Sequence, residues 1–252
     1  MLKKLSELVI SIWIWFFVAF LTVAVTFPIA FCSIFLAPFD PQRKCAHQIG
    51  NFWGKTISKV NPFWKFHING KENVDLRRNY VMVCNHSSMA DIICLYTLGM
   101  QFKWMAKTSL FKIPFFGWSM GFMKYIPLER GSHGSIRKSY DKARHWLEQG
   151  MSVLIFPEGT RSRDGSLGEF KNGAFKLAIE THKPILPIAI TGSNQAIAKG
   201  KATVGRKVSA ILSVLSPIDT KDCQLKDFEN LKNQARSSIK RELEKSALSL
   251  ST

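Results

Sequence analysis

The chain has 252 residues, 46% of them hydrophobic, and a formal net charge of +17, which is enough chain for one well-filled domain with or without a membrane element. The basic excess indicates an anionic partner, and membrane surfaces, phosphorylated small molecules and nucleic acids all qualify. Because the basic residues are dispersed, and no zinc-finger spacing or RNP-type aromatic motif is present, we expect lipid or phosphate partners and no nucleic acid.

The N-terminal end is far more apolar than the rest of the chain. Residues 8–39 contain no charged side chain, and as a straight helix they would be about 48 Å long, whereas the hydrocarbon core of a bilayer is about 30 Å thick. Pro28 lies beyond the middle of this run and is expected to kink or break a helix. We therefore predict a membrane anchor over residues 1–39. Its favoured form is a bent helical hairpin that enters one leaflet, and the alternative is a single tilted span.

A second helix is predicted over residues 40–60. Asp40 is a preferred N-cap, and Pro41 is typical of the first helical position. Apolar residues then recur at intervals near three and four, which gives one apolar stripe. This stripe fits either an amphipathic connector between membrane and catalytic domain or a helix packed on the soluble domain. Its members are Ile49, Phe52, Trp53, Ile57 and Val60.

Residues 61–252 are predicted to form one catalytic domain. Short apolar runs alternate there with helix-like segments, which predicts an α/β fold with a mixed, mostly parallel sheet flanked by helices. The predicted strands are 64–68, 80–84, 103–106, 124–127, 153–156, 185–190 and 208–215. The predicted helices are 90–98, 115–121, 135–149, 173–181 and 225–248.

The first candidate site is the stretch VMVCNHSSMAD, residues 81–91. An apolar run typical of a buried strand ends here and cap-like residues follow, so His86 is expected at a strand-to-helix junction. With Ser88 as N-cap, Asp91 falls in the first helical turn, where it can meet His86 in the approach loop. An Asp that binds one imidazole nitrogen leaves the other free to take a proton from a hydroxyl. The plain alternative is a capping box of Ser88 and Asp91, with His86 as a surface residue.

The second candidate site is the stretch VLIFPEGTRS, residues 153–162. A buried strand is followed by a Pro and Gly turn, which would present Glu158, Thr160 and Arg161 beside Gly159 at the edge of the sheet. The planar guanidinium of Arg161 suits a phosphate monoester, because it donates two parallel hydrogen bonds. Alternatively, this is an ordinary turn in which Arg161 pairs with Glu158.

The segments NHSSMAD and FPEGTRS, in this order and about seventy residues apart, together resemble the glycerophospholipid acyltransferase family, specifically the 1-acyl-sn-glycerol-3-phosphate acyltransferases. Three further segments are similar to blocks of that family, and the resemblance covers about residues 64–190. In the second of them, Glu129 stands where the family usually has a small or aspartate-like residue before the arginine. These segments are residues 107–117, 125–130 and 185–188.

The resemblance implies transfer of an acyl group from a thioester to the 2-hydroxyl of lysophosphatidic acid, which gives phosphatidic acid. It implies that His86 is the general base, steered by Asp91, in an HX4D motif. The donor would be acyl-CoA or acyl carrier protein, with no cofactor. Another lysolipid acceptor, or a non-catalytic membrane protein that binds anionic lipid, are the alternatives. The implied substrate-binding residues are Lys107, Arg130, Glu158, Gly159, Thr160 and Arg161.

The five cysteines are widely spaced and form no CxxC pair. We therefore expect reduced thiols that face the cytoplasm, and no metal site. Together with the apolar N-terminal end and the basic charge, this predicts a location at the cytoplasmic face of a membrane, such as the bacterial inner membrane.

Overall fold

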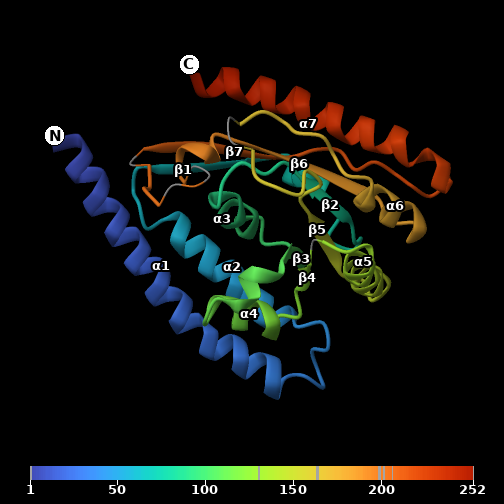
Figure 1. Ribbon diagram of the computed structural model, residues 1–252, viewed down its shortest axis with the longest axis horizontal. Helices are drawn as coiled ribbons and strands as arrows, with labels where there is room; N and C mark the ends of the chain where they lie inside the picture. The colour runs from blue at the N-terminus through green and yellow to red at the C-terminus, as the bar shows by residue number, and fades with distance from the viewer. Residues whose placement is uncertain are drawn as a thin grey trace.

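The computed structural model describes residues 2–129, 131–162, 165–197, 200, 202–205 and 207–251, with side chains from residue 6 to 250. Within these residues, seven strands form one sheet in the order β1-β7-β6-β2-β5-β3-β4 (Figure 1). Neighbouring strands are parallel, except that β6 and β7 are antiparallel. The predicted mixed, mostly parallel sheet is confirmed. The bounds are β1 (Trp64–Asn69), β2 (Val81–Cys84), β3 (Phe102–Lys107), β4 (Ile126–Leu128), β5 (Ser152–Ile155), β6 (Ile185–Thr191) and β7 (Val208–Val214).

Helices cover both faces of the sheet (Figure 1). The first four helices pack on one face and the last three on the other. The α-helices are α1 (Leu2–Phe35), α2 (Lys44–Ser58), α3 (Ala90–Thr97), α4 (Phe116–Phe122), α5 (His133–Glu148), α6 (Gly173–Glu180) and α7 (Phe228–Ser251). The short 3-10 helices are η1 (Lys71–Asn73), η2 (Thr108–Lys112), η3 (Ser193–Gln195) and η4 (Leu225–Asp227).

The central strand β2 is buried on both faces of the sheet. Its four residues are fully buried, and they alternate between the two hydrophobic cores. Met82 and Cys84 face the core under α1–α4, whereas Val81 and Val83 face the core under α5–α7. A strand buried on both faces reads as a continuous apolar run, which is the pattern of this segment.

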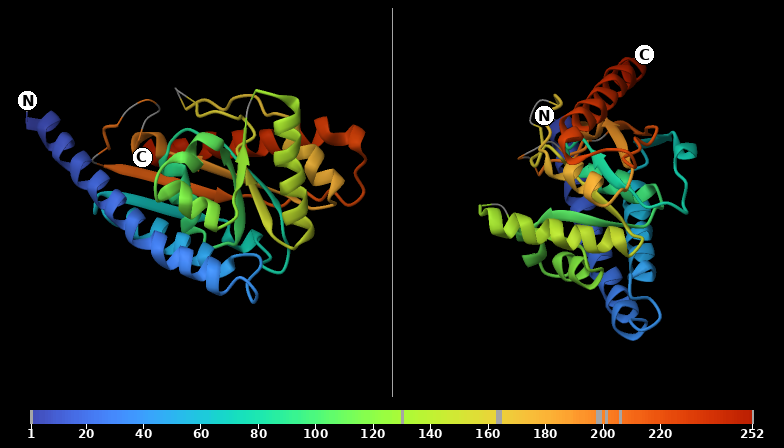
Figure 2. Two further views of the ribbon diagram at one scale, coloured as in Figure 1. Left: turned by 60° about the horizontal axis from the view of Figure 1, so that its bottom comes forward. Right: turned by 90° about the vertical axis from the view of Figure 1, so that its right-hand side faces the viewer.

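The N-terminal segment differs from its favoured prediction. Residues 2–35 form one continuous helix in spite of Pro28, so a hairpin within residues 1–39 is wrong. The chain reverses after Phe35, and α2 returns alongside α1 (Figure 2). In the described residues, one helical segment, Ser6–Phe35, is long and apolar enough to cross a membrane. Its insertion into a membrane stays a prediction.

The helix predicted over residues 40–60 is α2, which begins only at Lys44. Asp40 still caps it, because its carboxylate accepts hydrogen bonds from the backbone N–H of Lys44 at 2.9 Å and of Cys45 at 2.8 Å. α2 packs between α1 and α3 and buries Trp53. Phe52, a member of the predicted stripe, is exposed. The buried side of α2 therefore belongs to the core of the α/β domain.

Candidate active site

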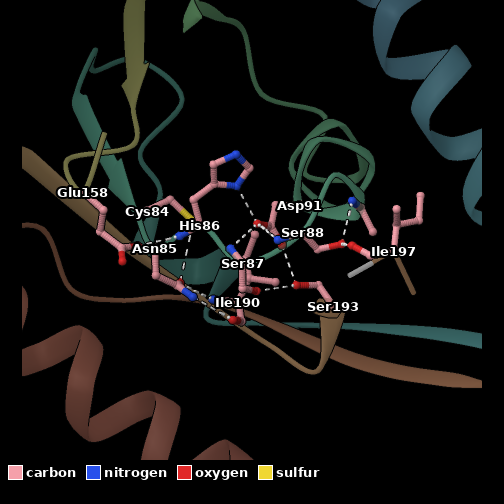
Figure 3. Close-up of polar contacts among 11 residues, drawn as sticks. Cys84, Asn85, His86, Ser87, Ser88, Asp91, Glu158, Ile190, Ser193 and Ile197 are labelled. Carbon is pink, nitrogen blue, oxygen red and sulfur yellow. Dashed lines mark hydrogen bonds and ion pairs between the residues drawn. The ribbon is translucent and has the colours of Figure 1, made fainter. Parts of the chain in front are cut away.

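His86 and Asp91 meet at the carboxyl end of β2. The Nδ1 atom of His86 lies 2.7 Å from Asp91 Oδ2 (Figure 3). The side chain of Asp91 is fully buried, whereas 17% of the His86 side chain is exposed. α3 begins at Ala90 with Met89 as its N-cap, so the prediction of Ser88 as the N-cap is wrong by one residue. His86 still lies in the approach loop and Asp91 in the first turn, as predicted. The structure thus brings the two residues of the HX4D pattern into contact.

The surroundings of Asp91 fix the tautomer of His86. Asp91 Oδ2 also accepts hydrogen bonds from the backbone N–H groups of Ser87 and Ser88, both at 2.9 Å. Because these groups can only donate, Oδ2 is an acceptor, and the proton of the shared bond belongs to His86 Nδ1. In the neutral ring Nε2 is then the basic nitrogen, and it lies farther from Asp91 (Figure 3).

The helix cap and the imidazole contact use the same carboxylate. Ser88 Oγ accepts a hydrogen bond from the backbone N–H of Ala90 at 3.0 Å, while Asp91 accepts from the backbone N–H of Ser88. In a capping box Ser88 Oγ would instead accept from the backbone N–H of Asp91, which here donates to the Ser88 carbonyl oxygen. Of the two alternatives in the sequence, the structure contains the His86–Asp91 pair and only one bond of the capping box, from the Ser88 N–H to Asp91.

Glu158 joins the turn after β5 to the loop that carries His86. Its carboxylate accepts hydrogen bonds from the backbone N–H of His86 at 2.8 Å and of Gly168 at 2.9 Å. The backbone N–H of Ser162 donates in turn to the carbonyl oxygen of His86 at 2.8 Å. Burial raises the pKa of the Glu158 carboxyl above its ordinary value. These bonds tie Glu158 to the loop that carries His86, and its part in substrate binding stays a prediction.

The ring of His86 has a second support on the strand side. It stacks on the ring of Phe156, directly after β5, with centroids 3.9 Å apart and planes at 13°. Together with the bond to Asp91, this contact leaves the imidazole one orientation in the loop. The Nε2 edge is therefore presented at a defined place.

A cavity of about 660 Å³ adjoins His86. The predicted residues Lys107, Gly159, Thr160 and Arg161 line it together with His86. Most of the other lining side chains are apolar or aromatic, and α1, α2, α3, β3, η2 and α4 are among the elements that supply them. Such a cavity suits a ligand with a hydrocarbon part and an anionic group.

Comparison with known proteins decides the family. A family model described as Acyltransferase matches residues 65–191, about half of the chain. The chain belongs to the acyltransferase family. The family that the two sequence motifs predicted is therefore confirmed.

Two relatives of this acyltransferase carry the same enzyme name. The chain is 36% identical over 229 residues to a chloroplastic 1-acyl-sn-glycerol-3-phosphate acyltransferase, LPAT1, of Arabidopsis thaliana, a match that covers 89% of this chain and 62% of the relative. It is 33% identical over 181 residues to a 1-acyl-sn-glycerol-3-phosphate acyltransferase of Borreliella burgdorferi, covering 71% of this chain and 72% of that one. The chain thus spans about three fifths of the Arabidopsis relative.

A solved structure extends the similarity of this acyltransferase to the whole fold. The crystal structure of the 1-acyl-sn-glycerophosphate acyltransferase PlsC from Thermotoga maritima matches with a TM-score of 0.85 at 26% sequence identity. The match covers 97% of this chain and 98% of that chain. It therefore includes the N-terminal helices, which the family model does not reach.

Some residues of the acyltransferase site were not found from sequence. Asn85 bonds both backbone groups of Ile190 on β6, accepting at 2.8 Å and donating at 2.9 Å. Ser193, after the same strand, bonds Asp91. Both contacts depend on the parallel pairing of β2 with β6. That pairing could have indicated them, but it can be inferred only when the order of the strands is known. Arg130, predicted to bind substrate, lies outside the described residues.

Proposed function

We propose that this acyltransferase transfers an acyl group from a thioester to the 2-hydroxyl of 1-acyl-sn-glycerol-3-phosphate, which gives phosphatidic acid. The observation that carries the proposal is that the fixed imidazole of His86 adjoins an apolar cavity that also holds Lys107 and Arg161. The names of the relatives support the same reaction.

His86 is the general base in this proposal. Nε2 takes the proton of the 2-hydroxyl as its oxygen attacks the thioester carbonyl, and Asp91 stabilises the imidazolium that forms. When the tetrahedral intermediate collapses, the C–S bond breaks and the imidazolium gives its proton to the leaving thiolate. Such a base contributes about 10² to 10⁴ in rate. The substrate supplies the nucleophile, so no acyl-enzyme is needed.

Lys107 and Arg161 bind the substrate phosphate. A guanidinium can donate two parallel hydrogen bonds to phosphate oxygens, whereas an ammonium acts as a point charge. Gly159 has a φ of +72°, and a Cβ there would lie 3.1 Å from Lys171 Cε. Lys171, which the sequence analysis did not single out, is therefore a third cation beside this turn.

The N-terminal helix α1 attaches the enzyme to a membrane, at the cytoplasmic face. Several large apolar side chains of α1 are more than half exposed, including Trp13, Phe16 and Phe20. Other α1 residues, among them Trp15 and Val18, line the cavity. One helix therefore offers an apolar outer surface to lipid and an apolar inner surface to the substrate. The donor is acyl-CoA or acyl carrier protein.

The test is turnover of His86→Ala with lysophosphatidic acid and an acyl-CoA in mixed micelles. We expect a loss of at least about 10²-fold with an unchanged melting temperature. His67→Ala is the matched control, because His67 is an exposed histidine on β1 that does not line the cavity. More than a few per cent residual activity in His86→Ala would exclude the base role. Faster turnover of another lysolipid by the wild-type enzyme would reassign the acceptor.

A further inference from the structure

A buried serine binds the second carboxylate oxygen of Asp91. Ser193 is fully buried in η3, directly after β6, and its Oγ lies 2.5 Å from Asp91 Oδ1. Gly192 before it has a φ of +82°, and a Cβ there would lie 2.2 Å from the carbonyl oxygen of Ser209. This turn therefore requires glycine, and it directs the Ser193 hydroxyl at the carboxylate (Figure 3).

The direction of these hydrogen bonds follows from the donors available. An ionised carboxylate only accepts, so Ser193 donates its single hydroxyl hydrogen to Asp91 Oδ1. Ser87 Oγ lies 3.2 Å from Ser193 Oγ and donates to it, because the hydrogen of Ser193 is already used. In the part of the chain that the structure describes, Ser193 is the donor to Oδ1, while Oδ2 serves His86 and two backbone N–H groups.

We propose that Ser193 is a positioning residue that locks the carboxylate of Asp91 toward His86. The terminal torsion of an Asp side chain is soft, so the carboxylate can turn about its Cβ–Cγ bond, and such a turn carries Oδ2 out of line with His86 Nδ1. The Ser193 bond to Oδ1 opposes this rotation in addition to the bonds at Oδ2, and so helps to keep Oδ2 in line with Nδ1. The inference rests on the proposed function, because Ser193 acts on the base only through Asp91.

The experiment is the pH profile of Ser193→Ala. A carboxylate that can rotate stabilises the imidazolium less, so we expect kcat to fall about 10- to 100-fold, the range of a hydrogen bond to a charged group. The KM values of both substrates should stay within about twofold of wild type, since Ser193 does not line the cavity. The acidic limb of kcat/KM should move to lower pH. A limb that stays in place would overturn the proposal, because a purely structural loss lowers the rate equally at each pH.

Ser213→Ala is the matched control. Ser213 is 3% exposed, and its hydroxyl likewise donates to a carboxylate, Glu242 Oε1, at 2.7 Å. It lies on β7 and does not line the cavity. We expect wild-type kcat and an unmoved acidic limb from this variant. If Ser213→Ala and Ser193→Ala lowered kcat equally, the effect would belong to the loss of a buried hydrogen bond in general, and the proposal would fail.

Two further variants separate the possible failures. Ser193→Cys keeps a weaker donor in place, so its kcat should lie between wild type and Ser193→Ala. In an Asp91→Ala background, Ser193→Ala should lower kcat by less than about threefold, because its target is gone; a full multiplicative loss would overturn the proposal. Turnover by His86→Ala would exclude the proposed base role. If His86→Ala is inactive and Ser193→Ala has the activity of the wild-type enzyme, only the inference about Ser193 fails.

Discussion

Replacement of Asp91 by Asn tests how the carboxylate acts on His86, because the structure dictates the orientation of the new side chain. The backbone N–H groups of Ser87 and Ser88 donate to the position that Oδ2 occupies in the wild-type protein. Because an N–H group can only donate, the amide oxygen of the new Asn must take this position. The NH₂ group then faces the hydroxyl of Ser193, which can accept. His86 Nδ1 keeps its acceptor and its proton. The variant therefore removes one negative charge and leaves the tautomer unchanged.

The lost charge sets the size of the effect. Two unit charges about 4 Å apart interact by about 4 kcal/mol at an effective dielectric constant of about 20. The imidazolium that forms in the transition state loses at most this stabilisation, which corresponds to at most about 10³-fold in kcat. In a triad where Asp→Asn also inverts the tautomer, the loss reaches about 10⁴-fold. The fixed amide oxygen is the reason to expect a smaller loss here.

The assay compares kcat and KM of Asp91→Asn and wild type with lysophosphatidic acid and one acyl-CoA between about pH 5 and pH 9. We expect kcat to fall between about 10- and 10³-fold and both KM values to stay within about twofold, because neither Asp91 oxygen lines the cavity. The acidic limb of kcat/KM should move to lower pH. Activity within threefold of wild type would refute the electrostatic role. A loss that reaches about 10⁴-fold would refute the retained tautomer.

Three other perturbations test separate parts of the molecule. Arg161→Ala should raise the KM for lysophosphatidic acid about tenfold or more and leave that for acyl-CoA within twofold; the opposite pattern would move Arg161 to the donor site. Burial lowers the pKa of Lys103 to about 7, whereas the unfolded chain keeps that proton to about pH 10, so stability should rise by about 2 kcal/mol from pH 7 to pH 9. Lys103→Met should abolish this rise in urea unfolding, and an equal rise in both proteins would contradict the assignment. Phe16→Lys with Phe20→Lys, both on the exposed surface of α1, should reduce sedimentation with anionic vesicles while the melting temperature is kept; unchanged sedimentation would move the anchor to the basic surface.

The elements of the fold were predictable because their signals are local. A buried strand such as β2 is a short apolar run that ends in polar, cap-like residues, and each predicted strand overlaps an observed one with bounds that differ by at most two residues. The break predicted at Pro28 is absent from α1, because tertiary packing outweighs the local tendency of proline to interrupt a helix. Thr26, two residues before Pro28, bonds Ser119 of α4 at 2.9 Å, and α1 packs along both α2 and α4. Such contacts stabilise a helix that its sequence alone would interrupt.

The site was predictable where it is contained in one segment. His86 and Asp91 are five positions apart, so cap geometry alone brings them together. The bond from Glu158 to the backbone of His86 joins residues 72 positions apart, and that from Ser193 to Asp91 joins residues 102 positions apart. Both depend on β2 lying between β5 and β6, an order that composition and periodicity do not encode. Neither of these two contacts could therefore be predicted from the sequence.

The strand order also explains why the reaction would take place at this point of the sheet. From β2 the chain crosses through α3, on one face, to β3, whereas from the adjacent β5 it crosses through α6, on the other face, to β6. Connections that leave neighbouring strands in opposite directions open a crevice between their carboxyl ends, where α/β proteins bind their ligands. His86 follows β2 and Arg161 follows β5, so the proposed base and the proposed phosphate ligand lie on the two sides of that crevice. Because α1 supplies an apolar wall of the same cavity, a lipid chain can stay against the helix while its polar end reaches both side chains.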